Sequence, residues 1–383
     1  MLVISVHKKV ILDLRDSPWV DGPGRTILEC AEDIDDAKFR IVVGAFANRQ
    51  PEGTLYEQEA QRRGLDVVRI HERRSADLAV LKQILSFVCS LEIDLIHTHD
   101  FRSNLYGIIA AKLTRKKVVA TVHGWITNDS KSRSKKKMDK FLLRFADHVI
   151  AVSNNTLSLL GNSIPTSRCT VIPNALRIEN YCPARPYGKF RKEFAIGEDD
   201  VLVANIGRLS PEKGQRLFLE AAREIAGKTS GVRFVLFGVG PDQSDLETMV
   251  NGSGLNKVVL FAGYRNEMNT IYNDIDLVVQ TSYTEGMPNV ILESLLMEVP
   301  VVATNVGGTR EIVRDGETGA LIPKGDLTAL VHKISEFLRD PGPYRAMAKL
   351  GRRDVANRFN HRERVRRLEA VYEALADPST DRY

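Results

Sequence analysis

Two cations lie five residues apart in the segment GRLSPEKG, which spans Gly207 to Gly214 and follows the apolar run VLVANI. The guanidinium of Arg208 is a planar fork and the ammonium of Lys213 a point charge, and together they can hold a diphosphate at the mouth of a sheet. Taken alone, the segment can equally be a solvated loop with a helix start near Pro211. It lacks the GxxxxGK[ST] pattern of a Walker loop, and the glycines at 238 and 240 lack the third glycine of a dinucleotide fingerprint.

Two carboxylates follow another apolar run, IDLVVQTS, in the segment TEGMPNVILE. Pro288 suits the first position of a helix, so we expect Glu285 in a loop, Glu293 on the helix and free backbone N–H groups at the helix start. Such N–H groups can bind a phosphate and stabilise negative charge on a leaving group. The carboxylates can accept hydrogen bonds from a polyhydroxylated ligand, one from a sugar ring and one from a ribose. Two glutamates at this separation also arise by chance, but their place after a strand, with Gly-Met-Pro-Asn between them, favours a binding site.

Short apolar runs recur along the chain with amphipathic stretches between them, a rhythm typical of βαβ units. The runs are KVILDL, RIVVGAF, LDVVRI, IDLIHTH, KVVATVHG, HVIAVS and TVIPN before residue 175, and VLVANIG, RFVLFG, KVVLFAG, IDLVVQTS and PVVAT after residue 200. Strands that are buried on both faces read as continuous apolar runs, so these runs predict parallel, doubly wound sheets. We therefore predict an α/β protein with two tandem Rossmann-like domains.

The alternation of apolar runs and amphipathic stretches stops between residues 176 and 199. This segment, LRIENYCPARPYGKFRKEFAIGED, contains proline, glycine and charged residues. We predict a first domain over 1–175, a linker over 176–199, a second domain over 200–357 and a C-terminal helix over 358–383. In open parallel sheets, ligands bind at the carboxyl ends of the strands, and the two charged segments follow strands in this way.

The composition is that of an ordinary globular chain, with 43% hydrophobic and 27% charged residues, and no apolar run approaches the ~20 residues that span a bilayer. The opening MLVISVHKKVILDLRD carries charge within its apolar stretch and has no small-residue cleavage site. It therefore indicates a first strand and not a signal peptide, and we expect a cytoplasmic protein.

The net charge of +5 is concentrated in residues 101–140, which hold 11 basic and 2 acidic side chains. We expect this stretch to contact anionic lipid at the inner face of a membrane, with a solvated helix start as the alternative. Nucleic acid is not expected as a partner, because interleaved aromatic residues are missing from the basic run. The basic residues that we assign to the membrane contact are Lys131, Arg133, Lys135, Lys136 and Lys137.

Neither a disulfide framework nor a metal site is expected. The cysteines at 30, 89, 169 and 182 stand far apart without a CxxC pair, which indicates packing residues. His97 and His99 lie at the end of a strand, but no carboxylate or cysteine is spaced to complete a metal site, so we expect structural roles for both. The two DID sequences, at 33–35 and 274–276, are expected to mark element boundaries.

GRLSPEKG, the E-x7-E of Glu285 and Glu293, the strand ending FAGYR, the VIPN before the linker and GGTREIV from Gly307 together resemble the retaining glycosyltransferases of family 4. The resemblance covers nearly the entire chain. It implies the GT-B fold, with two Rossmann-like domains, a cleft between them and a C-terminal helix that returns to the first domain.

The resemblance also implies roles for named residues. Arg208 and Lys213 would hold the donor diphosphate, Glu293 the ribose hydroxyls, and Glu285 would face the donor sugar. His123, in VHGW, would lie near that sugar as well. Backbone of the loop at Tyr264 and Arg265 would read the nucleotide base, and the segment Gly286, Met287, Pro288, Asn289 and Val290 would assist donor binding.

The chain departs from this family after its first strand, where family members usually have adjacent glycines and this chain has Asp21-Gly22-Pro23-Gly24-Arg25. Gly22 and Gly24 can still let the backbone approach a phosphate or sugar closely. The alternative is an ordinary turn before a helix that begins at Thr26.

The expected function is that of a retaining glycosyltransferase that moves a sugar from a UDP- or GDP-sugar to a glycan, a lipid-linked acceptor or another hydroxyl acceptor in bacterial envelope or exopolysaccharide biosynthesis. Arg208, Lys213 and the helix start at Asn289 would neutralise the leaving diphosphate, so no metal or other cofactor is expected. The alternatives are a catalytically silent nucleotide-sugar-binding protein and a GT-B nucleotide-sugar epimerase. An oxidoreductase is disfavoured by the missing glycine fingerprint.

Overall fold

The computed structural model of the protein describes residues 8–47, 50, 52–73, 77–125, 130–183 and 188–376. The chain divides into two compact units. The first unit takes residues up to Asn174 together with those from His361 onward, and the second unit runs from Ala175 to Asn360. Among the described residues, no helix combines the length and apolar character needed to cross a membrane.

The first unit is built on a parallel seven-stranded sheet in the order β3-β2-β1-β4-β5-β6-β7. Its strands are β1 (Lys9–Arg15), β2 (Phe39–Phe46), β3 (Asp66–Ile70), β4 (Leu95–Thr98), β5 (Lys117–Val122), β6 (His148–Ala151) and β7 (Cys169–Val171). Its helices are α1 (Gly22–Asp33), α2 (Leu55–Arg62), α3 (Leu78–Ser90), α4 (Phe101–Thr114), α5 (Ser130–Leu143), α6 (Asn154–Leu160) and α15 (His361–Ala376). Strand order reverses between β1 and β4, so the carboxyl ends of these two strands flank a switch point where ligands can enter.

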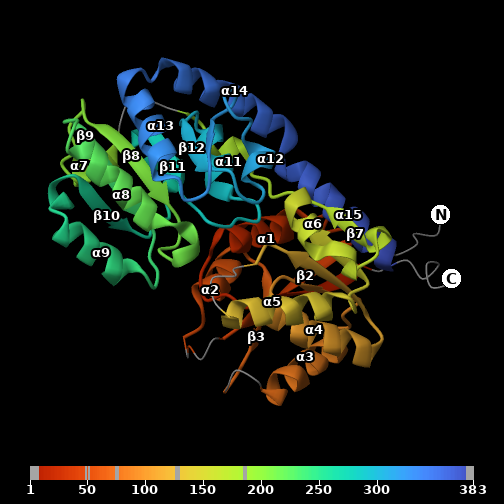
Figure 1. The fold of residues 1–383 in the computed structure, drawn as a ribbon. Helices are drawn as coiled ribbons and strands as arrows, with labels where there is room; N and C mark the ends of the chain where they lie inside the picture. Colours follow the sequence, from red (N-terminus) through yellow and green to blue (C-terminus); the bar gives the residue numbers. More distant parts are fainter. Residues whose placement is uncertain are drawn as a thin grey trace. The chain divides into compact units, whose positions relative to one another are not determined.

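The sheet of the first unit has an apolar core on each face, as continuous apolar strands require. One core joins it to α3, α4, α5 and α6, and the other joins it to α1, α2 and α15. Val365, Leu368, Val371 and Tyr372 recur at helical spacing along α15 and are buried in the second of these cores. The C-terminal helix therefore returns to the first unit and lies beside α1 (Figure 1).

The second unit is built on a parallel six-stranded sheet in the order β10-β9-β8-β11-β12-β13. Its strands are β8 (Val201–Ile206), β9 (Val232–Phe237), β10 (Val259–Gly263), β11 (Leu277–Gln280), β12 (Val301–Thr304) and β13 (Ala320–Ile322). Its helices are α7 (Lys189–Glu193), α8 (Gln215–Ala226), α9 (Gln243–Gly252), α10 (Met268–Ile271), α11 (Asn289–Leu296), α12 (Thr309–Ile312), α13 (Leu327–Arg339) and α14 (Gly342–Arg358). Its switch point lies between β8 and β11.

Three local expectations are corrected by the structure. Helix α1 begins at Gly22 and not at Thr26, because the Asp21 carboxylate accepts the N–H of Gly24 at 2.8 Å and caps the helix four residues earlier. Pro288 is the N-cap of α11, in extended conformation, so the first helical residue is Asn289. The run ALI at Ala320 forms β13 although only three residues long, and was not predicted as a strand.

Candidate active site

The loops that follow β8 and β11 meet at the switch point of the second unit. Their backbones are tied together, since the N–H of Tyr283 donates to the carbonyl of Glu212 at 2.7 Å. Gly214 makes this approach possible: a Cβ placed on it would lie 2.3 Å from the carbonyl oxygen of Thr281. In the same way, a Cβ on Gly307 would lie 1.8 Å from the carbonyl oxygen of Glu285. Glycines thus allow the charged segments predicted from the sequence to come together.

Lys213 and Glu285 form an ion pair at this point, with Nζ 2.7 Å from Oε1. The same carboxylate oxygen accepts from the Ser282 hydroxyl at 2.6 Å and from the Gln280 amide at 3.0 Å. The Glu285 side chain is only 7% exposed, whereas that of Lys213 is 28% exposed. Two of the residues predicted to bind the donor are therefore in direct contact, with the cation on the solvent side.

The Arg208 side chain is 58% exposed and lies near one buried carboxylate, with Nη2 3.4 Å from Oε1 of Glu212. Glu212 also accepts the Ser210 hydroxyl at 2.7 Å. The backbone carbonyl of Arg208 is held by the Gln215 amide at 2.9 Å. The loop therefore presents an accessible guanidinium, and Glu212, which no sequence motif indicated, lies beside it.

Glu293 is buried on α11 and accepts the hydroxyl of Tyr272 at 2.9 Å. Burial and then the Glu293 carboxylate raise the pKa of Tyr272 well above its usual value, so the phenol remains a neutral donor. Tyr272 was also missed from the sequence, because it precedes the β11 run in an unrelated segment. Met287 and Asn289, which precede Glu293 in the same segment, are buried as well.

The loop after β10 separates its two predicted donor-binding residues. Tyr264 is 49% exposed. Arg265 instead pairs with Glu193 of α7, with Nη2 2.5 Å from Oε1, and its guanidinium lies over the rings of Phe190 and Phe194. Its Nε donates to the carbonyl of Ala262 at 3.0 Å. Arg265 thus fixes the loop, and its side-chain charge is already compensated.

In the first unit, His123 directly follows β5 and lies beside His99, with His99 Nδ1 3.1 Å from His123 Nε2. His99 Nε2 in turn lies 3.1 Å from Oδ2 of Asp13 on β1. The sequence interpretation found no carboxylate spaced to complete a set with His97 and His99, and the fold supplies one from the adjoining strand. Atoms of Asp13, His97 and His99 that could bind a metal lie within 4.8 Å of one another.

Hydrogen bonds within the protein account for His97 without a metal. Its Nδ1 lies 2.7 Å from the hydroxyl of Tyr372, and its Nε2 lies 2.7 Å from the hydroxyl of Thr121. The structural role expected for His97 therefore agrees with its surroundings, while His99 bridges Asp13 and His123.

Gly22 and Gly24 lie in the first turn of α1, after the carboxyl end of β1. A Cβ on Gly24 would lie 3.0 Å from Oδ1 of its cap, Asp21. That carboxylate also pairs with the buried Arg15, at 2.9 Å. Arg15 is a further charged group at this strand end that no sequence motif indicated.

The aspartates at 274 and 276 accept from the Gly188 N–H and the Arg191 guanidinium, and they stand before β11, so this DID marks an element boundary as expected. All four cysteines, each within the described ranges, are free thiols. Cys30 is buried, but Cys89 and Cys182 are exposed, so the packing role predicted for these two is wrong.

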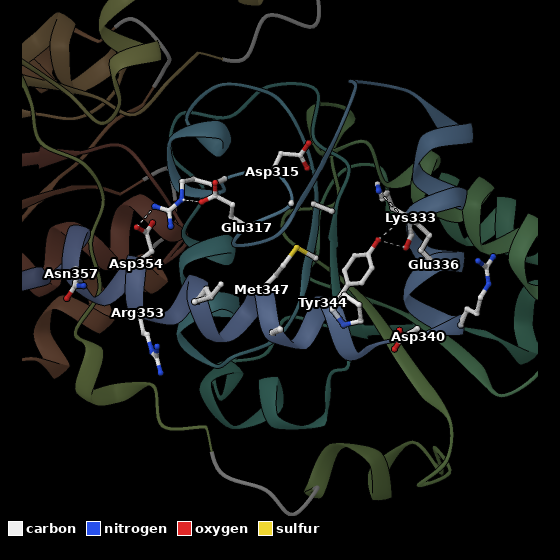
Figure 2. Close-up of a pocket in the computed structure, with 17 residues that line it drawn as sticks. Asp315, Glu317, Lys333, Glu336, Asp340, Tyr344, Met347, Arg353, Asp354 and Asn357 are labelled. Atoms are coloured by element: carbon white, nitrogen blue, oxygen red, sulfur yellow. Dashed lines mark hydrogen bonds and ion pairs between the residues drawn. The ribbon is translucent and has the colours of Figure 1, made fainter.

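Figure 2 shows a hollow in the second unit that is lined by none of the residues predicted for the site. It is lined by α13, α14 and the loop before β13, and so lies at the amino end of that strand. Its charges pair locally: Lys333 with Glu336 at 2.9 Å, and Arg314 with Asp354 at 2.7 Å (Figure 2). Since ligands enter parallel sheets at the carboxyl ends, this hollow is not the candidate site.

Two family models match successive parts of the chain. The model described as Glycosyltransferase Family 4 matches residues 20–180, and the model described as Glycosyl transferases group 1 matches residues 187–354. The resemblance to glycosyltransferase family 4 that was predicted from the sequence motifs is thereby confirmed.

Individual relatives agree. LpsB of Rhizobium meliloti (strain 1021), a lipopolysaccharide core biosynthesis mannosyltransferase, is 31% identical over 251 residues, 62% of this chain and 68% of the relative. The UDP-Gal:alpha-D-GlcNAc-diphosphoundecaprenol alpha-1,3-galactosyltransferase of Escherichia coli is 28% identical over 307 residues, 77% of this chain and 79% of the relative. The crystal structure of Anabaena Alr3699/HepE with UDP and glucose has a TM-score of 0.86 at 23% identity, and the match covers 96% of this chain and 100% of that one. This likeness confirms the predicted fold.

Proposed function

The chain belongs to glycosyltransferase family 4, and from this premise we propose that it transfers a hexose from a nucleoside diphosphate sugar to a hydroxyl acceptor with retention of configuration at the anomeric carbon. The observation that carries the proposal is the Lys213–Glu285 ion pair at the switch point, with the exposed guanidinium of Arg208 on the same loop as Lys213. This pairing joins a group that can hold phosphate to one that can accept a sugar hydroxyl.

Cleavage of a glycosyl phosphate bond builds positive charge on the sugar carbon and negative charge on the departing diphosphate. Arg208, Lys213 and the N-terminus of α11 at Asn289 neutralise the diphosphate in this proposal. These groups supply the charge stabilisation that a divalent cation would otherwise provide, so we expect activity without an added metal. The acceptor attacks from the face that the diphosphate leaves, and the diphosphate takes the acceptor proton.

The remaining site residues bind the donor. Glu285 accepts a hydroxyl of the donor sugar on its second oxygen, because Oε1 already receives Lys213, Ser282 and Gln280. Glu293 accepts the ribose hydroxyls, with Tyr272 holding its carboxylate. Gly22, Gly24 and His123 belong to the first unit, and their contact with the donor stays a prediction. The backbone at Tyr264, beside the anchored Arg265, reads the base.

The biological context follows from the named activities of the relatives. One uses UDP-galactose and a diphosphoundecaprenol-linked acceptor, and another is a mannosyltransferase of lipopolysaccharide core biosynthesis. We therefore assign the chain to bacterial polysaccharide assembly, with a UDP- or GDP-sugar as donor and a glycan or lipid-linked glycan as acceptor. It acts at the inner face of the membrane in this assignment.

Exposed basic and apolar side chains on α4, on α5 and in the turn after α5 support contact with an anionic membrane. The apolar side chains of Leu113, Met138, Phe141 and Phe145 are 63%, 52%, 50% and 47% exposed. Arg133, Lys135 and Lys137 are exposed on α5, whereas the side chain of Lys131 lies outside the described residues. Exposed apolar groups beside lysines fit an interface that combines burial in lipid with attraction to anionic headgroups.

Aromatic rings also lie close to this basic helix, which the linear pattern did not indicate. Lys136 lies over the ring of Trp125 at 5.4 Å, and Lys135 over that of Phe101 at 5.1 Å. The basic helix therefore has aromatic neighbours, which come from other segments of the first unit. The expectation of a lipid partner now depends on the exposed apolar residues.

The membrane contact is tested by flotation with vesicles of phosphatidylglycerol and with vesicles of phosphatidylcholine. Wild type should bind the anionic vesicles at low salt and dissociate at high salt. Phe141→Ser should weaken binding at low salt, and neutralising Lys135 and Lys137 should remove the salt dependence. Absence of binding to anionic vesicles at low salt would remove this part of the proposal.

The donor site is tested by thermal denaturation in the presence of a chelator with UDP, GDP, ADP, CDP, TDP and their common sugar conjugates. A ligand that binds only the folded state raises Tm. One nucleotide should stand out, and Arg208→Ala should abolish its effect. A stabilising nucleotide sugar that is never turned over would instead favour a silent binding protein, and conversion to an epimeric sugar would favour an epimerase.

A further inference from the structure

Three polar side chains form a row across the inner strands of the first unit. Asp13 lies on β1, His99 follows β4 and His123 follows β5, and these strands are successive neighbours in the sheet. His99 makes both contacts, through Nε2 to Oδ2 of Asp13 at 3.1 Å and through Nδ1 to Nε2 of His123 at 3.1 Å. Asp13 and His99 are 5% exposed each. A buried carboxylate is thereby connected through one imidazole to His123.

The direction of each hydrogen bond follows from the chemistry of the groups. An ionised carboxylate can only accept, so Nε2 of His99 carries the hydrogen and donates to Asp13. Burial lowers the pKa of His99 well below its usual value, so this ring is neutral and its Nδ1 holds a lone pair. That lone pair accepts from His123, whose Nε2 must then carry its hydrogen.

His123 is also neutral, because burial and then His99 lower its pKa well below the usual value. With its hydrogen on Nε2, its Nδ1 is an acceptor. This Nδ1 is buried and has no hydrogen-bond partner among the residues that the structure describes. A buried acceptor without a donor is costly, and a ligand hydroxyl removes that cost.

We propose that His99 and Asp13 are positioning residues that fix the tautomer of His123, so that its Nδ1 accepts a hydrogen bond from a ligand hydroxyl. The identity of that hydroxyl rests on the proposed function, whereas the tautomer does not. In other proteins a buried aspartate holds a catalytic imidazole in its working tautomer in the same way. Here a second imidazole lies between the two groups.

Protonation of Asp13 reverses the direction of both hydrogen bonds in the row. A protonated Asp13 donates to Nε2 of His99, so the hydrogen of His99 moves to Nδ1 and donates to Nε2 of His123. The hydrogen of His123 then lies on Nδ1, which becomes a donor. Burial raises the pKa of Asp13 to about 6, against the lowering effects of His97 and Arg15. The reversal therefore takes place near pH 6.

Other titratable and charged groups lie close to Asp13. The titratable and charged side chains that face it come from α1, α2, β1, β4 and α15: Cys30, Tyr56, Arg15, His97, His99, Arg364 and Tyr372. The pKa values of His97, Tyr56 and Tyr372 are displaced by burial so that these three groups stay neutral near pH 6. Asp13 is therefore the group in the row that changes charge in this range.

The test is a pH titration of the full chain labelled with 15N-histidine, read by long-range 1H–15N correlation, with the His123 signals assigned from His123→Gln. At pH 8, His123 should carry its hydrogen on Nε2, and it should change tautomer with a midpoint near pH 6. In Asp13→Asn this transition should be absent between pH 8 and pH 5, because residue 13 no longer titrates. A wild-type tautomer that does not change, or a change of the same midpoint in Asp13→Asn, would overturn the proposal.

Tyr372→Phe is the matched control, since it removes a hydroxyl from the same buried cluster without touching the row that leads to His123. It should keep the transition near pH 6, which separates positioning from a general effect on folding. If a donor is hydrolysed, kcat/KM should show an acid limb near pH 6 in wild type and in Tyr372→Phe, and no such limb in Asp13→Asn. If no UDP- or GDP-sugar is hydrolysed, the proposed function fails, and the histidine spectra still decide the row.

Discussion

Lys213 and Glu285 are proposed to bind different parts of the donor, and their charges compensate each other in an ion pair. The Glu285 carboxylate is almost fully buried, and a buried charge is costly unless a cation or several donors compensate it. Lys213 provides that compensation while its side chain keeps contact with solvent. One lysine therefore stabilises the carboxylate and remains available for a phosphate.

Replacement of Lys213 by alanine should affect donor binding and stability together. It leaves Glu285 with only its two neutral donors, so we expect a loss of roughly 2 kcal/mol in the free energy of unfolding, less than for a fully buried pair. We also expect the thermal shift by the best nucleotide to disappear. The matched control is Lys228→Ala, which removes an exposed lysine of the same unit. Equal behaviour of the two variants would contradict a role for Lys213.

Asp13 gives a prediction on stability with a definite sign. Its pKa is raised from 3.8 to about 6 in the folded protein, so its ionisation disfavours folding: the stability contribution is fully present below pH 3.8 and is lost as the pH rises through 6. Asp13→Asn should therefore raise the free energy of unfolding at pH 8 by up to about 3 kcal/mol, and the gain should vanish toward pH 4. Urea denaturation across this pH range measures it. A variant that is less stable than wild type at pH 8 would contradict the burial argument.

At the scale of elements, the close approach of the β8 and β11 loops depends on Gly214. Its φ of 66° is matched by the φ of 67° at Gly254, where an added Cβ would meet no atom within 4 Å. Both Gly→Ala changes incur the ~1 kcal/mol cost of a left-handed alanine, but only Gly214→Ala also forces a Cβ against the Thr281 carbonyl. We expect Gly214→Ala to be less stable than Gly254→Ala by about 2 kcal/mol in urea denaturation. Similar values would show that the loops are not held by this contact.

The elements themselves were largely predictable because a strand buried on both faces must be apolar throughout, and each of the predicted runs overlaps a strand of the structure. The exceptions have local causes. The start of α1 depends on a cap by Asp21, and β13 is only three residues long. The row from Asp13 to His123 could not be predicted, because Asp13 and His99 are 86 residues apart and meet only through the order of strands in the sheet.

At the scale of the whole molecule, the chain crosses between its two units twice, once after Asn174 and once after Asn360. The C-terminal helix α15 supplies part of a core whose other buried members lie between Ile11 and Ile172. The integrity of the first unit therefore depends on residues that follow the second unit in sequence.

Leu368→Ala in α15 should destabilise the first unit by about 2 to 4 kcal/mol, the range for a buried leucine. Hydrogen exchange read by mass spectrometry should show faster exchange in β1 and β2, while β8 and β11 keep their protection. Leu350→Ala, at a leucine of α14 that is 49% exposed, is the control and should change neither set. Equal loss of protection in both units would show that they unfold as one.

The most direct test of the proposed reaction is the fate of the donor. Wild-type protein is incubated with UDP-galactose, UDP-glucose, UDP-N-acetylglucosamine or GDP-mannose in the presence of EDTA, and the first sugar released to water is followed by 1H NMR. We predict release of the nucleoside diphosphate from one of these donors, with the α-anomer formed first, and a rate at least about 100-fold lower in Lys213→Ala. A β-anomer formed first would contradict retention. No turnover without a divalent metal, or equal turnover in Lys213→Ala, would contradict the assignment of the diphosphate site.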